Sequence, residues 1–187
     1  GTYKGVEITV TSTGIGAPSA AIAMEEMYES GMQVAVRMGT VMSMQDDMLG
    51  HFMIPIAAMR REGTSQSYVD LSYPAVADVE LVNVMNETVQ QMGKRYLNGL
   101  NCTMDGFYSC MHDSKFSLEC GRDMSKTFEE VKKLGVTGID MESSCILTLG
   151  RLMGVKTCIL TVVTVLENLK ETLKGQDRVD AEDLLCR

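Results

Sequence analysis

The sequence has no apolar run that reaches the roughly 18 residues expected of a membrane span, and no signal peptide is visible at its start. Basic residues are fewer than acidic ones, 17 against 25, so the formal net charge is −8. This balance disfavours nucleic acid as a partner, because phosphate backbones recruit basic surfaces. It does not disfavour a small anion, since one buried Arg holds a phosphate even inside an acidic protein.

Metal-binding cysteine motifs are also missing. None of the cysteines forms a CxxC pair, and no histidine lies at a zinc-ligand spacing. Several cysteines lie in apolar runs, so we interpret them as reduced core thiols of a cytosolic, cytoplasmic protein. The six are Cys102, Cys110, Cys120, Cys145, Cys158 and Cys186.

Internal repeats and low-complexity linkers are absent as well, so we expect a single domain over residues 1–187. That length is enough for a sizeable core, and 45% apolar with 22% charged residues is typical of globular proteins. The chain starts at Gly1 without a Met and enters a strand-like run at once. We therefore expect that an N-terminal segment is missing before it.

The first forty residues predict a strand–helix–strand unit. Residues 6–12 (VEITVTS) are rich in β-branched side chains and indicate a strand. Pro18 and Ser19 suit a helix start, and residues 20–30 indicate a helix that ends at Gly31. Residues 32–38 (MQVAVRM) indicate a second, buried strand. This spacing favours a parallel or mixed sheet.

The rest of the chain continues the alternation of strands and helices. Apolar residues recur at three- and four-residue steps through residues 78–93, which indicates a helix. The other expected strands are residues 52–60, 100–104 and 156–166, and the other expected helices are residues 124–134, 143–153 and the charged stretch from 168 to the end. We predict an α/β fold, a single domain with a mixed central β-sheet flanked by helices.

Arg37, Met38, Gly39 and Thr40 form the first candidate site, because an Arg closes an apolar strand and precedes a glycine and a hydroxyl residue. Ligands of open α/β sheets bind at the carboxyl ends of strands. A guanidinium there matches phosphate, and a Thr hydroxyl with nearby N–H groups completes a cradle. The alternative is an Arg paired with a carboxylate at the sheet edge, and from these four residues alone we favour that alternative.

Residues 12–19 (STGIGAPS) form a second candidate, since glycines lie between a strand and a helix start. Glycine lets the backbone approach a ligand closely, and helix N-termini attract anions. A structural tight turn is the commoner explanation of such a run.

Asp140, Met141, Glu142 and Ser143 form a third candidate just before a helix. An ionised carboxylate is a pure acceptor and suits the hydroxyl groups of a ribose. Acidic residues at a helix start also stabilise the helix by about 0.3–1 kcal/mol through its dipole. From these four residues alone we favour that explanation.

Residues 103–108 (TMDGFY) form a fourth candidate, at the end of an expected strand. Phe107 and Tyr108 could stack on a base or on the face of a sugar. Packing of both rings in the core is an equally good interpretation.

Together, the order and spacing of these motifs resemble the nucleoside phosphorylase superfamily, its uridine phosphorylases in particular. The resemblance runs from residue 1 to about residue 166. The segments that carry it are a hairpin at residues 1–5, the ungapped run from 12–19 through Glu25 and Glu26 to 37–40, and residues 73–78 (YPAVAD), 103–108 and 139–144 (IDMESS).

The resemblance implies a role for each candidate residue. Phosphate would be bound by Arg37, Gly39 and Thr40, and ribose by Met141 beneath the sugar with Glu142 and Asp140 at its hydroxyls. The base would contact Phe107, Tyr108 and Met111. No cofactor is required, but some relatives hold a structural cation at a dimer interface, which implies Ile15 and Ser19 here. Relatives assemble as dimers or rings of dimers, so a homo-oligomer that binds a nucleoside and inorganic phosphate is implied.

Several positions depart from the pattern of the family. Its N-terminal phosphate-binding segment is absent, as is the basic residue that a neighbouring subunit lends to the site. The family has a Gln and an Arg that bind the edge of uracil, and Met111 and Asp113, with His112 between them, occupy those positions here. The family also has a Gly-rich turn where this chain has Val41 and Met42. The Ser-Asp pair of the purine branch is missing from residues 164–168 (TVLEN), where Glu167 sits wrongly for that role.

The resemblance therefore favours the pyrimidine branch. It implies phosphorolysis of uridine, or of deoxyuridine, to uracil and ribose 1-phosphate or its deoxy form. A purine nucleoside phosphorylase, a nucleosidase that uses water, and a non-catalytic nucleoside-binding paralogue remain the alternatives.

Overall fold

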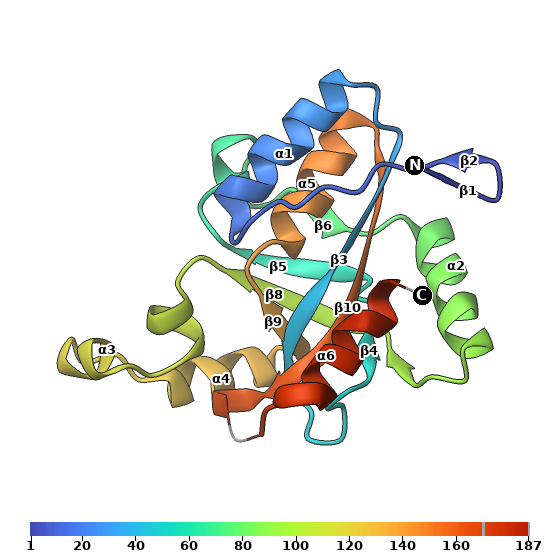
Figure 1. The fold of residues 1–187 in the computed structure, drawn as a ribbon. Coiled ribbons are helices and arrows are strands. Elements are labelled where there is room, and N and C mark those ends of the chain that lie inside the picture. The colour runs from blue at the N-terminus through green and yellow to red at the C-terminus, as the bar shows by residue number, and fades with distance from the viewer. Residues whose placement is uncertain (170, 187) are drawn as a thin grey trace.

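A computed structural model of the chain describes residues 1–169 and 171–186, apart from the side chain of residue 168. In this part of the chain, eight strands form one mixed sheet in the order β6-β5-β8-β9-β3-β10-β4-β7 (Figure 1). The strands are β3 (Val34–Ser43), β4 (Phe52–Met53), β5 (Ala57–Arg61), β6 (Ala75–Val76), β7 (Tyr96–Leu97), β8 (Leu100–Met104), β9 (Val136–Asp140) and β10 (Lys156–Leu166). The predicted α/β class with a mixed sheet is confirmed.

Helices cover the sheet, with α1 and α5 side by side on one flank and α4 and α6 near the opposite end (Figure 1). The helices are α1 (Ala17–Glu29), α2 (Val79–Gln91), α3 (Lys115–Glu119), α4 (Met124–Lys133), α5 (Ser143–Met153) and α6 (Gly175–Asp183). Shorter 3₁₀ turns span Ser65–Ser67, Glu167–Leu169 and Leu184–Cys186, and a π turn spans Phe107–Met111. None of the described helices is long and apolar enough to cross a membrane.

The helix starts follow from the local sequence. Pro18 lies in the first turn of α1, where the missing N–H costs no hydrogen bond. The carboxylate of Asp78 caps α2 by accepting from the backbone N–H groups of Glu80 and Leu81, each at 3.1 Å. The structure confirms both predicted helices, whose start signals lie in the local sequence.

A hairpin opens the chain, as the resemblance implied. Strands β1 (Thr2–Tyr3) and β2 (Val6–Glu7) pair across a two-residue turn in which Lys4 and Gly5 both have positive φ. The strand predicted for residues 6–12 ends at Glu7, however, and residues 8–12 are exposed. β-branched side chains favour an extended backbone, but a strand needs a hydrogen-bonded neighbour. The backbone of Ile8 still exchanges hydrogen bonds with Gly1, but no strand of the described chain pairs with residues 9–12.

Two other strands differ from the expectation. Strand β3 continues to Ser43 because β10 pairs with it in parallel along its length, so Arg37 lies inside the strand rather than at its end. The strand expected at residues 52–60 is broken into β4 and β5 around Pro55, which has no N–H to donate to a neighbour.

Two large hydrophobic clusters stabilise the sheet. The first joins α1 and α5 to the sheet through small and aliphatic side chains. The second lies beneath α4 and is rich in methionine, with Met42, Met44, Met104, Met111 and Met124 among its buried members. Unbranched Met side chains fill such irregular spaces well.

Candidate active site

Three parallel strands end at one edge of the sheet. Strand β5 pairs with β8, and β8 pairs with β9, with Arg61 opposite Met104 and Thr103 opposite Asp140. The segments that begin at Glu62, Asp105 and Met141 therefore leave the sheet together. Strand β9 runs antiparallel to β3, so its end returns along β3 toward Arg37. This topology brings distant candidate motifs to one place.

Arg37 and Glu142 form an ion pair at this edge. Nη2 of Arg37 donates to Oε2 of Glu142, and Nη1 lies 3.5 Å from Oδ2 of Asp140. The side chains of Arg37 and Glu142 are 14% and 8% exposed, so solvent screens the pair only weakly. Nη1 is itself buried and makes no hydrogen bond to a described residue. The structure thus places the predicted phosphate and ribose residues in direct contact.

The glycine-rich run joins the same site through Gly16. Its backbone N–H donates to Oε1 of Glu142 at 2.6 Å. Gly16 has a φ of 91°, in the region that favours glycine, so the turn directs its N–H at the carboxylate without a side-chain penalty. Both oxygens of Glu142 are therefore held before any ligand arrives.

Asp140 is more enclosed than its expected ribose role implies. Its Oδ1 accepts from Thr103 Oγ1 at 2.9 Å and from the backbone N–H of Ser143 at 3.3 Å, and its Oδ2 accepts from the Ser143 hydroxyl. It is buried. The structure places Asp140 as an anchor under Arg37 and the start of α5 rather than at the surface of the site.

Gly39 leaves space for the guanidinium of Arg37, the candidate ligand of phosphate. The guanidinium of Arg37 folds back over it, and a Cβ added at Gly39 would meet Nη1 at 3.1 Å. Thr40 follows on the same strand and is partly buried, while Met141 packs against the methionine-rich cluster below.

The aromatic residues follow strand β8. Phe107 and Tyr108 are both exposed and meet edge to face, with ring centroids 5.0 Å apart. The ring of His112 lies 5.9 Å from each of them. Met111 is only 5% exposed and belongs to the core, so its side chain is not presented to a base in this structure. The winding of the π turn directs Met111 inward, while Phe107 and Tyr108 stay exposed.

Asp113, His112 and Glu167, which the sequence analysis also considered, have the following surroundings. Asp113 Oδ1 and His112 Nδ1 are buried and make no hydrogen bond to a described residue. Glu167 forms an ion pair with Lys132, so its carboxylate is occupied.

The expected cation residues lie at the start of α1. Ile15 is 80% exposed, and the hydroxyl of Ser19 donates to the carbonyl of Thr13. Among the described residues, no group of three or more His, Cys, Asp or Glu side chains is arranged to hold a metal ion. The oxygen-ligated cation implied by the resemblance does not need such a group and stays a prediction.

Two buried thiols, Cys102 and Cys145, lie near the site. Burial raises the pKa of Cys102 and of Cys145 to about 12, so both stay protonated at neutral pH. All six cysteines are free, and Cys102, Cys145 and Cys158 are buried as core thiols.

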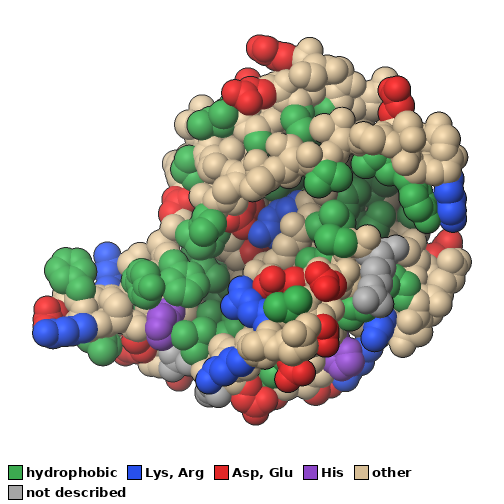
Figure 2. Space-filling model, in the orientation of Figure 1, with side chains coloured by type: hydrophobic (Ala, Val, Ile, Leu, Met, Phe, Trp, Pro, Cys, Tyr) green, Lys and Arg blue, Asp and Glu red, His purple; other side chains and the backbone are tan. Residues whose placement is uncertain are grey.

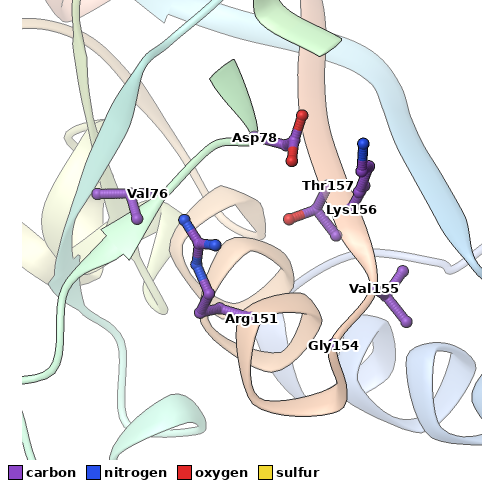
Figure 3. A pocket seen from close by; sticks show the side chains of 7 residues that line it. All are labelled: Val76, Asp78, Arg151, Gly154, Val155, Lys156 and Thr157. Atoms are coloured by element: carbon purple, nitrogen blue, oxygen red, sulfur yellow. The ribbon is translucent and has the colours of Figure 1, made fainter. Parts of the chain in front are cut away.

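A cavity of about 200 Å³ lies at the opposite end of α5 from Glu142 (Figure 3). Arg151, Lys156 and Asp78 line it, so charges of both signs face the space. Figure 2 shows a hollow over the central sheet on one face of the molecule, with hydrophobic and basic side chains within it.

Sequence reasoning missed four polar residues that support the site. Arg60 lies in β5, Glu62 and Ser65 follow that strand, and Ser144 lies in the first turn of α5. The one available signal was position, since Glu62 follows the end of a parallel strand.

Comparison with known proteins decides the family. The sequence profile described as the phosphorylase superfamily matches residues 1–183. This chain belongs to the phosphorylase superfamily. Two similar members are the uridine phosphorylase of Thermococcus kodakarensis, 36% identical over 164 residues, and that of Escherichia coli, 31% identical over 163 residues. A solved member, the uridine phosphorylase of Vibrio fischeri ES114 in complex with 6-hydroxy-1-naphthoic acid, superposes with a TM-score of 0.81 at 31% identity.

The matches span a larger share of this chain's length than of the length of its relatives. They span 87% and 86% of this chain, but 59% of the Thermococcus protein and 64% of the Escherichia protein. The structural match covers 100% of this chain and 70% of the Vibrio chain.

Proposed function

We propose that this chain is a uridine phosphorylase, a pentosyltransferase that splits uridine with inorganic phosphate into uracil and ribose 1-phosphate. Deoxyuridine would react in the same way. The observation that carries the proposal is the contact between Arg37 and Glu142, because it joins an anion-binding cation to a hydroxyl-binding carboxylate. The similar proteins named uridine phosphorylase support the choice of base.

The reaction would need little covalent work from the protein. A phosphate oxygen forms a bond to the anomeric carbon of ribose as the bond from that carbon to the base nitrogen breaks. The electron pair of the broken bond leaves with uracil, and the ribosyl centre gains oxocarbenium character. Catalysis then rests on positioning and on charge complementarity.

Each side chain retains capacity for its ligand. A carboxylate offers about four lone-pair positions, and Glu142 uses one for Gly16 and one for Arg37, which leaves acceptors for ribose hydroxyls. Nη1 of Arg37 is buried and has no hydrogen-bond partner among the described residues, so a phosphate oxygen that reached it would meet an unused donor. Phe107 and Tyr108 offer exposed aromatic faces and edges to a base.

The charge at the site also supports a homo-oligomer, a dimer or a ring of dimers. Two carboxylates, Asp140 and Glu142, surround one guanidinium, so a phosphate dianion needs a further cationic group to bind tightly. A second copy of the chain would supply such a group. The exposed apolar side chains of Ile8, Val10, Ile15 and Ile22 offer a surface for that copy. Light scattering coupled to gel filtration tests the assembly.

Further parts of the proposal are a cytoplasmic location, no required cofactor and a structural cation near Ile15 and Ser19 at the interface. Six free thiols suit a reducing compartment. A main-chain carbonyl and a hydroxyl are hard oxygen ligands. Melting temperatures with and without potassium or magnesium test the cation.

The decisive assay mixes the protein with phosphate and one nucleoside at a time and follows the free base. We expect uracil from uridine and deoxyuridine, and little base from adenosine or guanosine. Release of a purine alone would assign the chain to another branch of the superfamily. Binding of uridine without turnover would indicate a non-catalytic relative.

A further inference from the structure

Helix α5 starts in an unusual way. Glu142 is its N-cap residue, yet the side chain of Glu142 makes no capping hydrogen bond. An N-cap side chain ordinarily accepts from a backbone N–H of the first turn. Here the Glu142 carboxylate is turned to Arg37 and Gly16 instead. Other groups must therefore hold the first turn of the helix.

Asp140 holds the first residue, Ser143, and Ser144, the second residue of α5, attaches the helix to two further strands. Its backbone N–H donates to Thr103 Oγ1 at 2.8 Å, and its hydroxyl donates to Oε1 of Glu62 at 2.9 Å. Ser144 is fully buried and Glu62 is nearly so. The two contacts attach the helix start to the ends of β8 and β5, the same sheet edge that carries the site.

Glu62 is itself fixed from the other side. Its Oε2 accepts from the Ser65 backbone N–H at 2.8 Å, and its Oε1 also accepts from the Ser65 hydroxyl. The Ser65 hydroxyl in turn accepts from Nε of Arg60 at 2.9 Å. Arg60 donates its remaining hydrogen bonds to the carbonyls of Val69, Asp70 and Tyr73, which holds the following loop.

Burial of a carboxylate costs free energy unless hydrogen bonds or opposite charges replace the water that it loses. No Lys, Arg or His of the described chain forms an ion pair with Glu62, so hydrogen bonds and the positive end of α5 stabilise it. A fully bonded polar network of this kind fixes one geometry of the helix start.

We propose that Glu62 is a positioning residue, which acts through Ser144 to set where Glu142 presents its carboxylate to the pentose. The inference rests on the proposed function. Small displacements of a binding group cost much of its effect. Loss of the Glu62–Ser144 contact therefore lowers the affinity for the nucleoside, while Arg37 on β3 still binds phosphate.

The test uses Ser144→Ala, with Thr148→Val as its matched control. Thr148 lies one turn further along α5, is equally buried, and its hydroxyl has no partner among the described residues. Nucleoside affinity by calorimetry and the KM values for uridine and phosphate are measured for both variants, with melting temperatures to report folding. We expect Ser144→Ala to weaken uridine about tenfold and to leave the KM for phosphate unchanged, whereas Thr148→Val matches the wild type.

Glu62→Gln provides a second variant, and the double variant with Ser144→Ala closes a cycle. If the two residues act through one contact, the double variant binds uridine no worse than Glu62→Gln alone. Should Glu62→Gln fail to fold, Ser144→Ala decides alone, because Ala is well tolerated in a helix. Wild-type uridine affinity in Ser144→Ala, or equal weakening of uridine and phosphate, overturns the inference. A wild-type protein that binds no nucleoside overturns the proposed function as well.

Discussion

The guanidinium of Arg37 and the carboxylate of Glu142 lie 105 positions apart in the sequence and form one ion pair in the fold. The antiparallel pairing of β3 with β9 makes this contact, because it returns the end of β9 along the strand that carries Arg37. A cation suited to phosphate and an acceptor suited to ribose therefore share one small site. The predictions below separate their two tasks.

Arg37→Ala is expected to reduce phosphate-dependent turnover strongly. A hydrogen bond to a charged group contributes about 1.5–3 kcal/mol, which corresponds to a loss of about tenfold to a hundredfold in kcat/KM for phosphate. Arg37→Lys keeps the charge but loses the planar fork, so it should recover part of the activity. Steady-state kinetics at varied phosphate provide the measurement, and wild-type phosphate affinity in Arg37→Ala would contradict the assignment.

Glu142→Gln is expected to weaken uridine more than phosphate. The substitution keeps the size of the side chain but replaces one acceptor oxygen by a donor, so hydroxyl groups of the pentose lose a partner. Calorimetric titration with each ligand alone measures the two affinities. Equal losses of both would point to a general disturbance of the fold instead.

Gly39→Ala is expected to disturb phosphate binding through Arg37. The added methyl group would lie 3.1 Å from Nη1, so the guanidinium must shift. Overpacking of this kind costs about 1 kcal/mol or more, which is about a fivefold rise in the KM for phosphate. Gly63→Ala is the control, since its Cβ would meet Asp105 at an ordinary 3.6 Å. An unchanged KM in Gly39→Ala would mean that Arg37 does not act from this position.

The stability of the protein is expected to fall above pH 9. Burial raises the pKa of Cys102 and Cys145 to about 12 and that of Cys158 to about 11, from an ordinary value of 9.0. Above pH 9 the unfolded chain releases these protons and the folded chain retains them, so the free energy of unfolding decreases as pH rises toward 11–12. Each thiol contributes at most about 1.4 kcal/mol per pH unit, and nothing below pH 9.

Urea unfolding at pH 8 and pH 10 measures this loss. Cys158→Ala should reduce the difference between the two pH values, whereas Cys120→Ser, at an exposed position, should leave it unchanged. An equal difference in all three proteins would show that other groups control the alkaline behaviour.

Much of the fold could be predicted because its strongest signals are local. The apolar run of β10 and the periodic, capped helix α2 need no knowledge of their neighbours. Strand β9 was missed because Gly138, at its centre, has no side chain to indicate a strand. Close approach explains that glycine, since a Cβ there would meet Asn101 and Met53.

Part of the candidate site could also be predicted from the sequence, and part could not. The motifs around Arg37 and Glu142 could be found in the sequence, and the order of the motifs indicated that they act together. The inward turn of Met111 and the link from Glu62 to Ser144 could not be predicted, because they depend on the register between β5, β8 and β9 and on the winding of the turn after β8.

Phosphorus NMR of the wild-type protein with uridine and inorganic phosphate tests the central claim most directly, since it observes the new bond between phosphate and the pentose. We expect a ribose 1-phosphate signal that grows in step with free uracil and stays absent when phosphate is omitted. Uracil released together with free ribose, at a rate that phosphate does not change, would contradict it.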